Sequence, residues 1–585
     1  MKKYHFLFMI VIAGICSCSD LLELQNDGRM TLDEVFADRN GIRGYLNSCY
    51  NYRYIFTYTR SSLCDEAHDS DGTYANTLPS NWYGNTYSPT TYASTDGNGA
   101  WQRYFEGIRK CNVFIDYMSR LSPGAIMASE GELTGWVAQA RTLRALYYLQ
   151  LIKRYGATPL LTEAYTTTHD YSVDRRASFS EIVTQILKDC DDALAAPDIE
   201  DGFSWDVRVN QRGIMTRAVA YAIKSEAVTY ACSPLWADGV YNWTDATRIN
   251  AEALRQCTTH GYELFSDTPA ENVAQNTYAL YFITRPDELR AYDKETIYTG
   301  AFVNVWQQSG MPSTPGQTKA GSCPTQEMVD SYEMANGEPP ILGYSDVRHL
   351  NPIVNTASGY NPNDPYVNRD PRFYATVYYH GSLRTLGANP TLVETVVGAV
   401  DGITTTDRRT THTGYYLRKY NNWTSNRDND ADGATRLFRV AMLYLNFAES
   451  AYQSHGPDVA VDLGGGISMS ARDAVGAVRN RAGMPPFPAG MSPSDFEKKY
   501  RNERRVELAF EDHRYFDVRR WKILEETERY VTGMRITQEG GSLNYTRIGF
   551  ERGSWIDKYY LYPIPQSEVN KMQDHTGVNW QNPGW

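Results

Sequence analysis

Apolar side chains recur at helical spacing along much of this chain, and this periodicity limits the fold more than any other feature. Within residues 135–155 the apolar positions follow at steps of four, three, four and four, which draws one stripe along a helix: Trp136, Ala140, Leu143, Tyr147 and Leu151. A second stripe covers residues 178–195, where Ser178 and Glu181 have the spacing of a capping box. Further helices are predicted at 101–121, 212–231, 437–453, 471–481 and 493–510. Neighbouring helices form pairs of roughly 30–40 residues, as in helix-hairpin repeats.

Long tracts rich in Gly, Pro, Asn and Tyr separate these helices, at 50–100, 260–435 and 525–585. Plain loops of such length are uncommon, so we expect short strands and ligand-facing turns within them. Residues 295–306 and 372–381 have the β-branched and aromatic content of strands. The prediction is one mainly α domain over 18–585, with its helical body at about 18–50, 101–260 and 437–525. The irregular, partly β, ligand-facing tracts are about 50–100 and 260–435.

The N-terminus has the pattern of an export signal. Lys2 and Lys3 precede an apolar stretch, Phe6–Ile15, which is too short to span a bilayer. Cys18 follows the small residue Ser17, as in the lipobox of bacterial lipoproteins. We therefore expect a signal peptide at 1–17 and acylation of Cys18, which would leave the mature chain on a lipid anchor. The alternative is an ordinary signal peptide without a lipid. No other stretch is long and apolar enough to cross a membrane.

The net charge and the aromatic content of the chain limit the classes of ligand that it can be expected to bind. The net charge of −12, without a basic run, argues against nucleic acid and against polyanionic ligands, so a neutral ligand fits better. The chain has 44 Tyr and 12 Trp against 19 Phe, and Tyr and Trp suit ligand platforms because they combine an apolar face with a polar group. No zinc-type His spacing, nucleophile elbow or Walker loop occurs, and no cofactor is expected.

The cysteines beyond the signal peptide lack C-x-x-C spacing, so most are expected to be small buried residues. Cys49 and Cys64 are near in sequence, and a bridge between them stays open.

A series of segments resembles one family along nearly the whole mature chain. In chain order they are "RALYYLQLIKRYGATPLLTE" (144–163), "CPTQEMVDSYEMANG" (323–337), "NRDPRFYATV" (368–377), "GYYLRKY" (414–420), "LYLNFAESA" (443–451), "VRNRAGMP" (478–485), "RNERRVELAFEDHRYFDVRRW" (501–521) and "YPIPQSEV" (562–569). Behind a lipobox and in this order, they resemble the SusD/RagB family, the surface glycan-binding lipoproteins of Bacteroidetes.

This resemblance implies a helical body of four tetratricopeptide-like helix pairs with a large irregular, partly β portion packed on it. It also implies a location on the extracellular face of the cell outer membrane and a partner, a SusC-like TonB-dependent transporter. In such a pair the protein captures an oligosaccharide and delivers it to the transporter, and it performs no chemistry itself. Two alternatives stay open: a lid protein for a non-glycan nutrient such as a peptide, and a secreted glycosidase.

Two acidic stretches are candidates for a catalytic or a metal site. Glu503, Glu507 and Glu511 are spaced at i, i+4 and i+8, but each has an Arg within reach that would keep it ionised, whereas a general acid needs a raised pKa. A glycosidase would need two carboxylates about 5–10 Å apart across a cleft. Asp428, Asp430 and Asp432 have the spacing that opens a calcium loop, but Arg439 occupies the twelfth position, where a bidentate Glu is required. We expect a solvated turn there, with a calcium site formed by Asp428, Asp430 and Asp432 as the alternative.

Carbohydrate binding needs a ring for the C–H face of a sugar and polar side chains for its hydroxyl groups. Two stretches supply both, "SNWYGNTY" (80–87) and "FVNVWQQSG" (302–310). The expected stacking rings are Trp82, Tyr83 and Trp306, and the expected polar contacts are Asp71, Asn85 and Gln307. For each ring the alternative is a place in the core. Trp101 is expected to begin a scaffold helix, and Tyr87 and Tyr92 are expected to pack their loop on itself.

Overall fold

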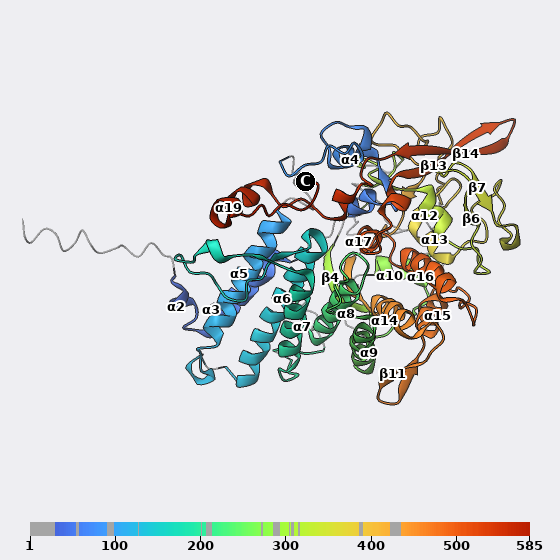
Figure 1. Cartoon of the computed structure of the whole chain (residues 1–585). Helices are drawn as coiled ribbons and strands as arrows, with labels where there is room; N and C mark the ends of the chain where they lie inside the picture. Colours follow the sequence, from blue (N-terminus) through green and yellow to red (C-terminus); the bar gives the residue numbers. More distant parts are fainter. Residues whose placement is uncertain are drawn as a thin grey trace, which may run out of the picture.

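The computed structural model describes residues 30–53, 58–90, 99–126, 128–200, 202–205, 213–270, 273–284, 293–302, 305, 309–313, 316–384, 390–421 and 434–585. Within them, long helices form a row and an irregular portion with short strands lies at one end of that row (Figure 1). The chain is therefore mainly α-helical with a partly β portion packed on it, as the sequence predicted.

Each helix of the row packs against the next, and most are consecutive in sequence. Their order runs from the N-terminal helices at one end to the helices after residue 440 at the other (Figure 1). The row consists of α3 (Arg39–Cys49), α5 (Ala100–Met118), α6 (Glu130–Tyr155), α7 (Phe179–Leu194), α8 (Arg217–Ala231), α9 (Trp243–Thr259), α14 (Val440–His455) and α15 (Ala471–Arg481). No separate helix range was predicted for α3 or α9; the other helices of the row match the predicted ranges to within a few residues at most of their ends.

Local signals explain where the central helix of the row begins and ends. The Ser129 hydroxyl accepts from the Glu132 amide, and the Glu132 carboxylate accepts from the Ser129 amide at 2.9 Å, which closes a capping box. Helix α6 ends at Gly156, whose φ of +69° favours glycine. A Cβ there would also lie 3.0 Å from the ring of Trp236. The second half of α6 is buried all round, because α5 and α7 pack on it.

The remaining helices connect the row to the irregular portion or lie within it. The C-terminal ones are α16 (Pro493–Glu507), α17 (Arg514–Arg520), α18 (Leu524–Glu528) and α19 (Gln566–Thr576). The short ones are α2 (Leu32–Val35), α4 (Leu78–Tyr83), α10 (Thr277–Ile283), α12 (Gln326–Ser331) and α13 (Pro371–Thr376). Helix α19 lies over the N-terminal half of the row and not in the irregular portion (Figure 1).

The strands pair two by two, each pair antiparallel, and none of the pairs described here joins a larger sheet. The pairs are β1 (Ala67–Asp69) with β5 (Ser322–Pro324), β2 (Thr158–Pro159) with β3 (Arg176–Ala177), β4 (Thr296–Phe302) with β10 (Ala434–Arg439), β6 (Ile341–Tyr344) with β7 (Pro352–Val354), β8 (Val377–Tyr378) with β9 (Tyr416–Leu417), β11 (Val461–Gly464) with β12 (Ile467–Met469), and β13 (Tyr530–Glu539) with β14 (Ser542–Glu551).

One strand prediction holds and one is largely wrong. Residues 295–306 contain β4, as expected. Residues 372–381 instead begin inside helix α13, and only Val377 and Tyr378 pair as a strand. The reason is the pair before the aromatic run: the Asp370 carboxylate caps the Arg372 amide at 2.9 Å, and Pro371 occupies the first helical position.

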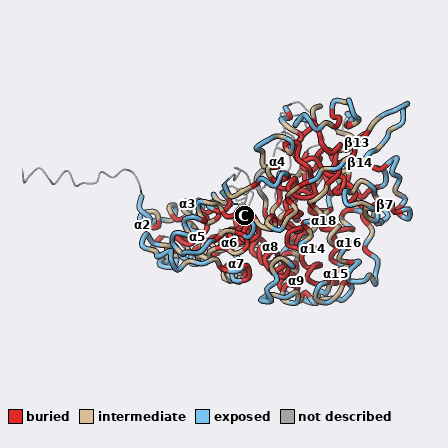
Figure 2. Tube along the Cα trace, turned by 45° about the horizontal axis from the view of Figure 1, so that its top comes forward, coloured by how far each residue is buried: buried red, intermediate tan, exposed pale blue. Residues whose placement is uncertain are grey.

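Two large apolar cores, with two small apolar clusters beside them, hold the described part of the molecule together (Figure 2). The larger one runs through the helical row and takes in the C-terminal residues Tyr559, Tyr562 and Trp580. The smaller one fills the irregular portion around Phe373 and Tyr415. The cysteines that the structure describes are all buried and free, so Cys49 and Cys64 do not bridge. Among the described helices, none is both long and apolar enough to cross a bilayer.

Candidate ligand-binding site

The two rings expected to stack on a ligand in the first stretch belong to the scaffold. Trp82 is 0% exposed, and its indole meets the rings of Tyr87 and Tyr559 edge-on at centroid distances of 5.3 and 4.6 Å. Tyr83 is 8% exposed and stacks on His68 at 4.7 Å. Its hydroxyl donates to the Ser62 carbonyl at 2.7 Å. A sugar cannot reach a ring face covered in this way, so the expectation for these two rings does not hold in this structure.

A helix missed by the sequence analysis explains this burial. Residues 78–83 form α4, and the Thr77 hydroxyl caps it by accepting from the Ser80 amide at 3.2 Å. Pro79 occupies its first turn, where a missing amide hydrogen costs nothing. The signal was present in "TLPS", but the surrounding Gly and Asn residues favoured a loop. Tyr87 and Trp101 are buried, as expected.

Gly72 shows how closely this helix fits its surroundings. A Cβ at Gly72 would lie 2.6 Å from the Tyr83 ring, so only glycine allows the backbone to approach the ring there. Asn85 is exposed, but its side-chain oxygen accepts from the Tyr559 hydroxyl at 2.9 Å. The structure thus places Asn85 at a scaffold contact.

Several other predicted residues lie outside the described part of the chain: Cys18, Tyr92, Trp306, Gln307, Asp428, Asp430 and Asp432. The residues on either side of 306–308 are described. Val305 and Ser309 are both fully buried, and the Ser309 hydroxyl accepts from the Ser322 amide at 3.1 Å. Ser322 pairs with Asp69 in the β1–β5 ladder, so the flanks of this segment are anchored beside the stretch that carries Asp71.

Among the predicted polar contacts, Asp71 is the one that the structure places in a cluster of charged side chains. Its carboxylate accepts from the Lys319 amine at 3.0 Å and from the Arg408 guanidinium at 2.8 Å. Burial opposes the charge of Lys319, but Asp69 and Asp71 outweigh it and raise the Lys319 pKa. Asp71 therefore joins two cations from distant parts of the chain.

Arg408 presents its guanidinium to solvent at this point. Its side chain is 46% exposed and lies 5.5 Å above the centroid of the Tyr74 ring. The Tyr74 hydroxyl accepts from the Arg408 amide at 3.0 Å and lies 3.3 Å from the Thr406 carbonyl, to which it donates. We call Asp71, Tyr74, Lys319 and Arg408 the rim cluster.

Three segments far apart in sequence build the rim cluster: 69–77, 309–321 and 404–412. The second and third are tied together, because the Ala320 amide donates to the Arg408 carbonyl at 2.8 Å and the Gln317 side chain donates to the Arg409 carbonyl at 2.6 Å. The sequence analysis did not identify Tyr74, Lys319 or Arg408. No spacing rule connects them, since only the packing of these loops brings them together.

The rim cluster has the chemistry of a binding site for hydroxyl-rich molecules. Arg408 offers several N–H donors in one plane and Tyr74 offers an aromatic ring, whereas Asp71, which is 5% exposed, holds the guanidinium in place and is too buried to contact a ligand directly. Behind it, burial lowers the pKa of His68 and of His412, which keeps both imidazoles neutral. Among the described residues, no group of three His, Cys, Asp or Glu side chains could hold a metal ion.

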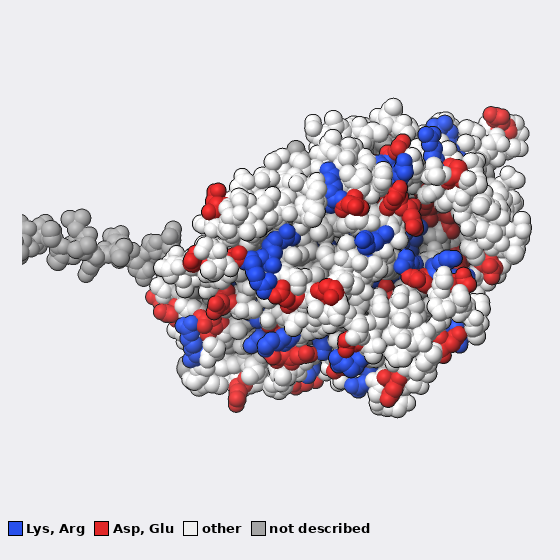
Figure 3. Space-filling view, viewed as in Figure 1, with Lys and Arg blue, Asp and Glu red and all other residues white. Residues whose placement is uncertain are grey.

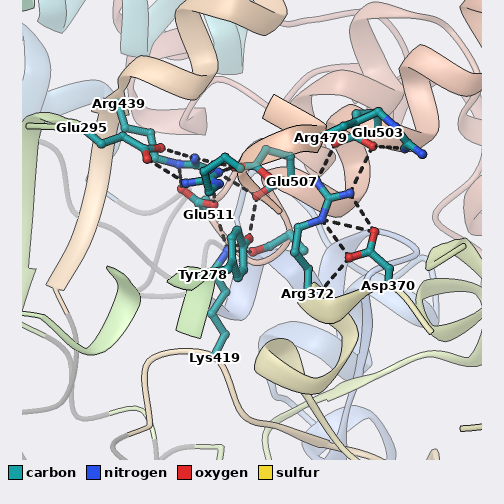
Figure 4. A network of polar contacts seen from close by, with 12 residues as sticks. Tyr278, Glu295, Asp370, Arg372, Lys419, Arg439, Arg479, Glu503, Glu507 and Glu511 are labelled. Atoms are coloured by element: carbon teal, nitrogen blue, oxygen red, sulfur yellow. Dashed lines mark hydrogen bonds and ion pairs between the residues drawn. The ribbon is translucent and has the colours of Figure 1, made fainter. Parts of the chain in front are cut away.

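The acidic stretch weighed as a catalytic site forms a buried ionic network (Figure 4). Arg372 donates to Glu503 at 2.5 Å and to Glu507 at 2.9 Å, and Arg439 donates to Glu507 and Glu511 at 2.7 Å each. Burial opposes the charge of Glu507, but Arg481, Arg439 and Arg372 outweigh it and lower its pKa to about 2. A carboxyl held ionised in this way cannot act as a general acid. The network instead joins α16 to α13 and β10.

Comparison with known proteins places these features in a family context. The model of the SusD family matches residues 287–585, and a second model, described as starch-binding and associating with the outer membrane, matches residues 20–210. No curated protein matches this chain.

Solved structures share the fold. A SusD-like protein from Bacteroides fragilis is 24% identical, with a TM-score of 0.74 over 95% of this chain and 100% of that one. A SusD-like carbohydrate-binding protein from the same species is 20% identical, with a TM-score of 0.65 over 92% and 98%. A laminarin-binding SusD-like protein is 19% identical, with a TM-score of 0.53 over 94% and 100%. At these identities the likeness shows the fold alone.

Proposed function

This chain belongs to the SusD family, and from that premise we propose that it captures an extracellular oligosaccharide and delivers it to a SusC-like TonB-dependent transporter. In this proposal Cys18 carries the lipid that anchors the mature chain to the outer membrane, on its extracellular face. The protein binds and does not cleave its ligand.

The observation that carries the proposal is the rim cluster. A glycan is held by hydrogen bonds to its hydroxyl groups and by contact of its C–H faces with a ring. The exposed guanidinium of Arg408, held in place by Asp71 and resting on Tyr74, supplies such groups at one point of the surface. Because these side chains already hold one another, little conformational entropy is lost when a ligand binds.

Charge supports a neutral glycan. Asp69 and Asp71 face Lys319 and Arg408, so the charges of the cluster balance. On the face shown in Figure 3, Lys and Arg are interspersed with Asp and Glu and form no large patch of one sign. A strongly anionic polysaccharide would be expected to meet a basic surface.

Trp306 and Gln307 stay part of the proposal as the stacking ring and a polar contact. Their described neighbours, Val305 and Ser309, are anchored next to the strand that leads to Asp71. A ring in this segment would complement Tyr74, since an oligosaccharide platform needs more than one aromatic surface.

A glycan panel tests the proposal. Purified protein would be run in native gels containing starch, laminarin, mannan, xylan or pectin, with Trp306→Ala beside wild type. We expect retardation by at least one neutral polysaccharide and a weaker effect for the variant. Retardation by none of them, together with binding of a peptide, would favour the peptide-lid alternative. New reducing ends in the incubated glycans would show a glycosidase.

A further inference from the structure

A groove separate from the rim cluster lies between α5 and α19. Its volume is about 520 Å³, within the range of pockets that hold small organic ligands. Its lining is completed by side chains from residues 159–165, by Tyr171 and Asp174, and by Trp580. None of the four rim-cluster residues lines it.

Aromatic rings line the groove from both sides. On α5, Trp101 and Phe105 pack at a centroid distance of 4.9 Å. Facing them, Tyr171 is 41% exposed and meets the ring of Tyr165 edge-on at 6.0 Å. His169 stacks on the Tyr165 ring at 3.4 Å, which fixes its orientation. Tyr171 also meets His169 edge-on at 4.8 Å and His575 of α19 at 5.4 Å, and a ligand can reach the part of its ring that stays exposed.

Polar side chains border these rings. Gln102 donates to Glu106 at 2.7 Å on α5, and Lys571 donates to Glu568 at 2.7 Å on α19. Gln102, Glu106 and Lys571 are exposed, so they keep spare hydrogen-bonding capacity for a ligand. The guanidinium of Arg109 donates a hydrogen bond to the Tyr165 carbonyl at 3.0 Å.

The balance of charge in the lining disfavours an anionic occupant. The lining holds four acids (Glu106, Glu163, Asp174 and Glu568) and two bases (Arg109 and Lys571), an excess of two negative charges. A phosphate or a uronic acid would be repelled by this lining. Apolar rings bordered by amide, carboxylate and ammonium groups suit a neutral molecule with apolar faces and many hydroxyl groups, which describes a sugar.

We propose that the groove between α5 and α19 is a second binding site for a short neutral oligosaccharide, with Tyr171 as its stacking ring and Gln102 and Glu106 as polar contacts. This inference rests on the proposed glycan-binding function. It adds a second point of attachment for the same class of ligand.

The C-terminal segment, residues 557–585, contacts both this groove and the residues that follow α4. Trp580 lines the groove, while Trp585 packs against Tyr87 at 5.8 Å and the Tyr559 hydroxyl donates to Asn85. The C-terminus is drawn between α19 and α4 in Figure 1. A long polysaccharide held at both sites would bind more tightly than a short one, because the second contact forms within the same complex.

Titration calorimetry with short oligosaccharides from starch, laminarin and mannan tests this site. For an oligosaccharide that binds, we expect two ligands per wild-type chain and one per chain for Tyr171→Ala or Gln102→Ala, or affinity at the second site weakened at least about fivefold. Both side chains are at the surface, so their loss should leave the melting temperature nearly unchanged. Tyr241→Ala, a partly buried tyrosine outside the groove, is the matched control and should keep both sites.

Two outcomes separate this inference from the proposed function. If wild type binds one ligand per chain and the groove variants bind it equally well, the groove is not a glycan site and the proposed function stands. If wild type binds none of these oligosaccharides and no polysaccharide of the gel panel retards it, both the proposed function and the second site are wrong; if a polysaccharide retards it, only the second site is wrong. Binding of two ligands that Tyr171→Ala and Gln102→Ala leave unchanged would also overturn the groove assignment.

Discussion

The indole ring of Trp82 lies edge-on to the phenol ring of Tyr559, with the ring centroids 4.6 Å apart and the planes at 69°. This contact joins α4 to the C-terminal segment. The C-terminal segment, residues 557–585, also lines the groove through Trp580. Trp82, which the sequence predicted to face a ligand, therefore holds together two parts of the scaffold that border the proposed binding surfaces.

Trp82→Ala should therefore destabilise the fold. Removing a fully buried aromatic side chain costs about 3–5 kcal/mol, and the edge-on contacts to Tyr87 and Tyr559 are lost as well. Chemical denaturation followed by circular dichroism would measure this loss. Trp82→Phe should recover part of the stability. An unchanged unfolding midpoint for Trp82→Ala would mean that the ring is not in the core.

Arg408→Ala should weaken glycan binding and leave stability nearly intact. Hydrogen bonds from a charged donor contribute about 1.5–3 kcal/mol, so roughly a tenfold or greater loss of affinity is expected. The ion pair with Asp71 is 46% exposed on the Arg408 side, and its loss should cost less than about 1 kcal/mol of folding free energy. Calorimetry and thermal melting measure the two effects.

The control for that variant is Arg175→Ala. Arg175 also forms a surface ion pair, with Glu181 at the start of α7, far in sequence from the rim segments. It should bind glycan like wild type. Equal binding by Arg408→Ala and wild type would remove the rim cluster from the proposed function.

Glu507→Gln should be severely destabilising and should flatten the acid limb of the pH–stability curve. The substitution removes the one carboxylate that Arg372, Arg439 and Arg481 share in a fully buried network, and breaking buried ion pairs in this way costs about 3–5 kcal/mol. In the wild-type protein the folded pKa of Glu507, about 2, is below the usual 4.5. The contribution of Glu507 to the free energy of unfolding is therefore full above pH 4.5 and is lost as the pH falls toward 2.

Urea midpoints measured from pH 7 down to pH 2.5 would check this. Glu497→Gln, on the same helix but partly exposed and paired with Arg501, is the control and should change stability by less than about 1 kcal/mol. A Glu507→Gln protein with wild-type midpoints at every pH would contradict the role given to the network.

Ionisation of Glu66 should make the fold less stable as the pH rises toward neutral, which is opposite to the pH dependence contributed by Glu507. Burial raises its pKa to about 7, although it accepts a hydrogen bond from the Phe510 amide at 3.0 Å. The folded pKa is above the usual 4.5, so its stabilising contribution is full below pH 4.5 and is lost as the pH rises through 7. The shift corresponds to a change of roughly 3 kcal/mol.

Glu66→Gln should remove this part of the pH dependence, and Glu263→Gln, an exposed carboxylate paired with Lys294, should not. Unfolding free energies at pH 5 and pH 8 give the comparison. Identical differences between the two pH values for wild type and Glu66→Gln would show that Glu66 does not titrate in this range.

Much of the helical body could be predicted because its signals are local. Stripes of apolar residues and caps such as Ser178 with Glu181 depend on neighbours within one or two turns, and the helices formed where these signals stand. The failure at residues 372–381 was also local in origin: the aromatic run resembled a strand, but the preceding Asp370 and Pro371 start a helix.

The candidate site is formed by contacts between segments far apart in the chain, and no pattern in the sequence predicts those contacts. By itself the sequence determined most of the long helices, the family resemblance and the acidic groups that need cationic partners, since these follow from residue types at short spacing. Only the tertiary structure decided that Trp82 and Tyr83 are core residues and that Asp71 lies with Lys319 and Arg408. The physical reason is that burial and long-range ion pairing depend on which distant segments pack together, and loops of Gly, Asn and Thr carry no periodic pattern that specifies their partners.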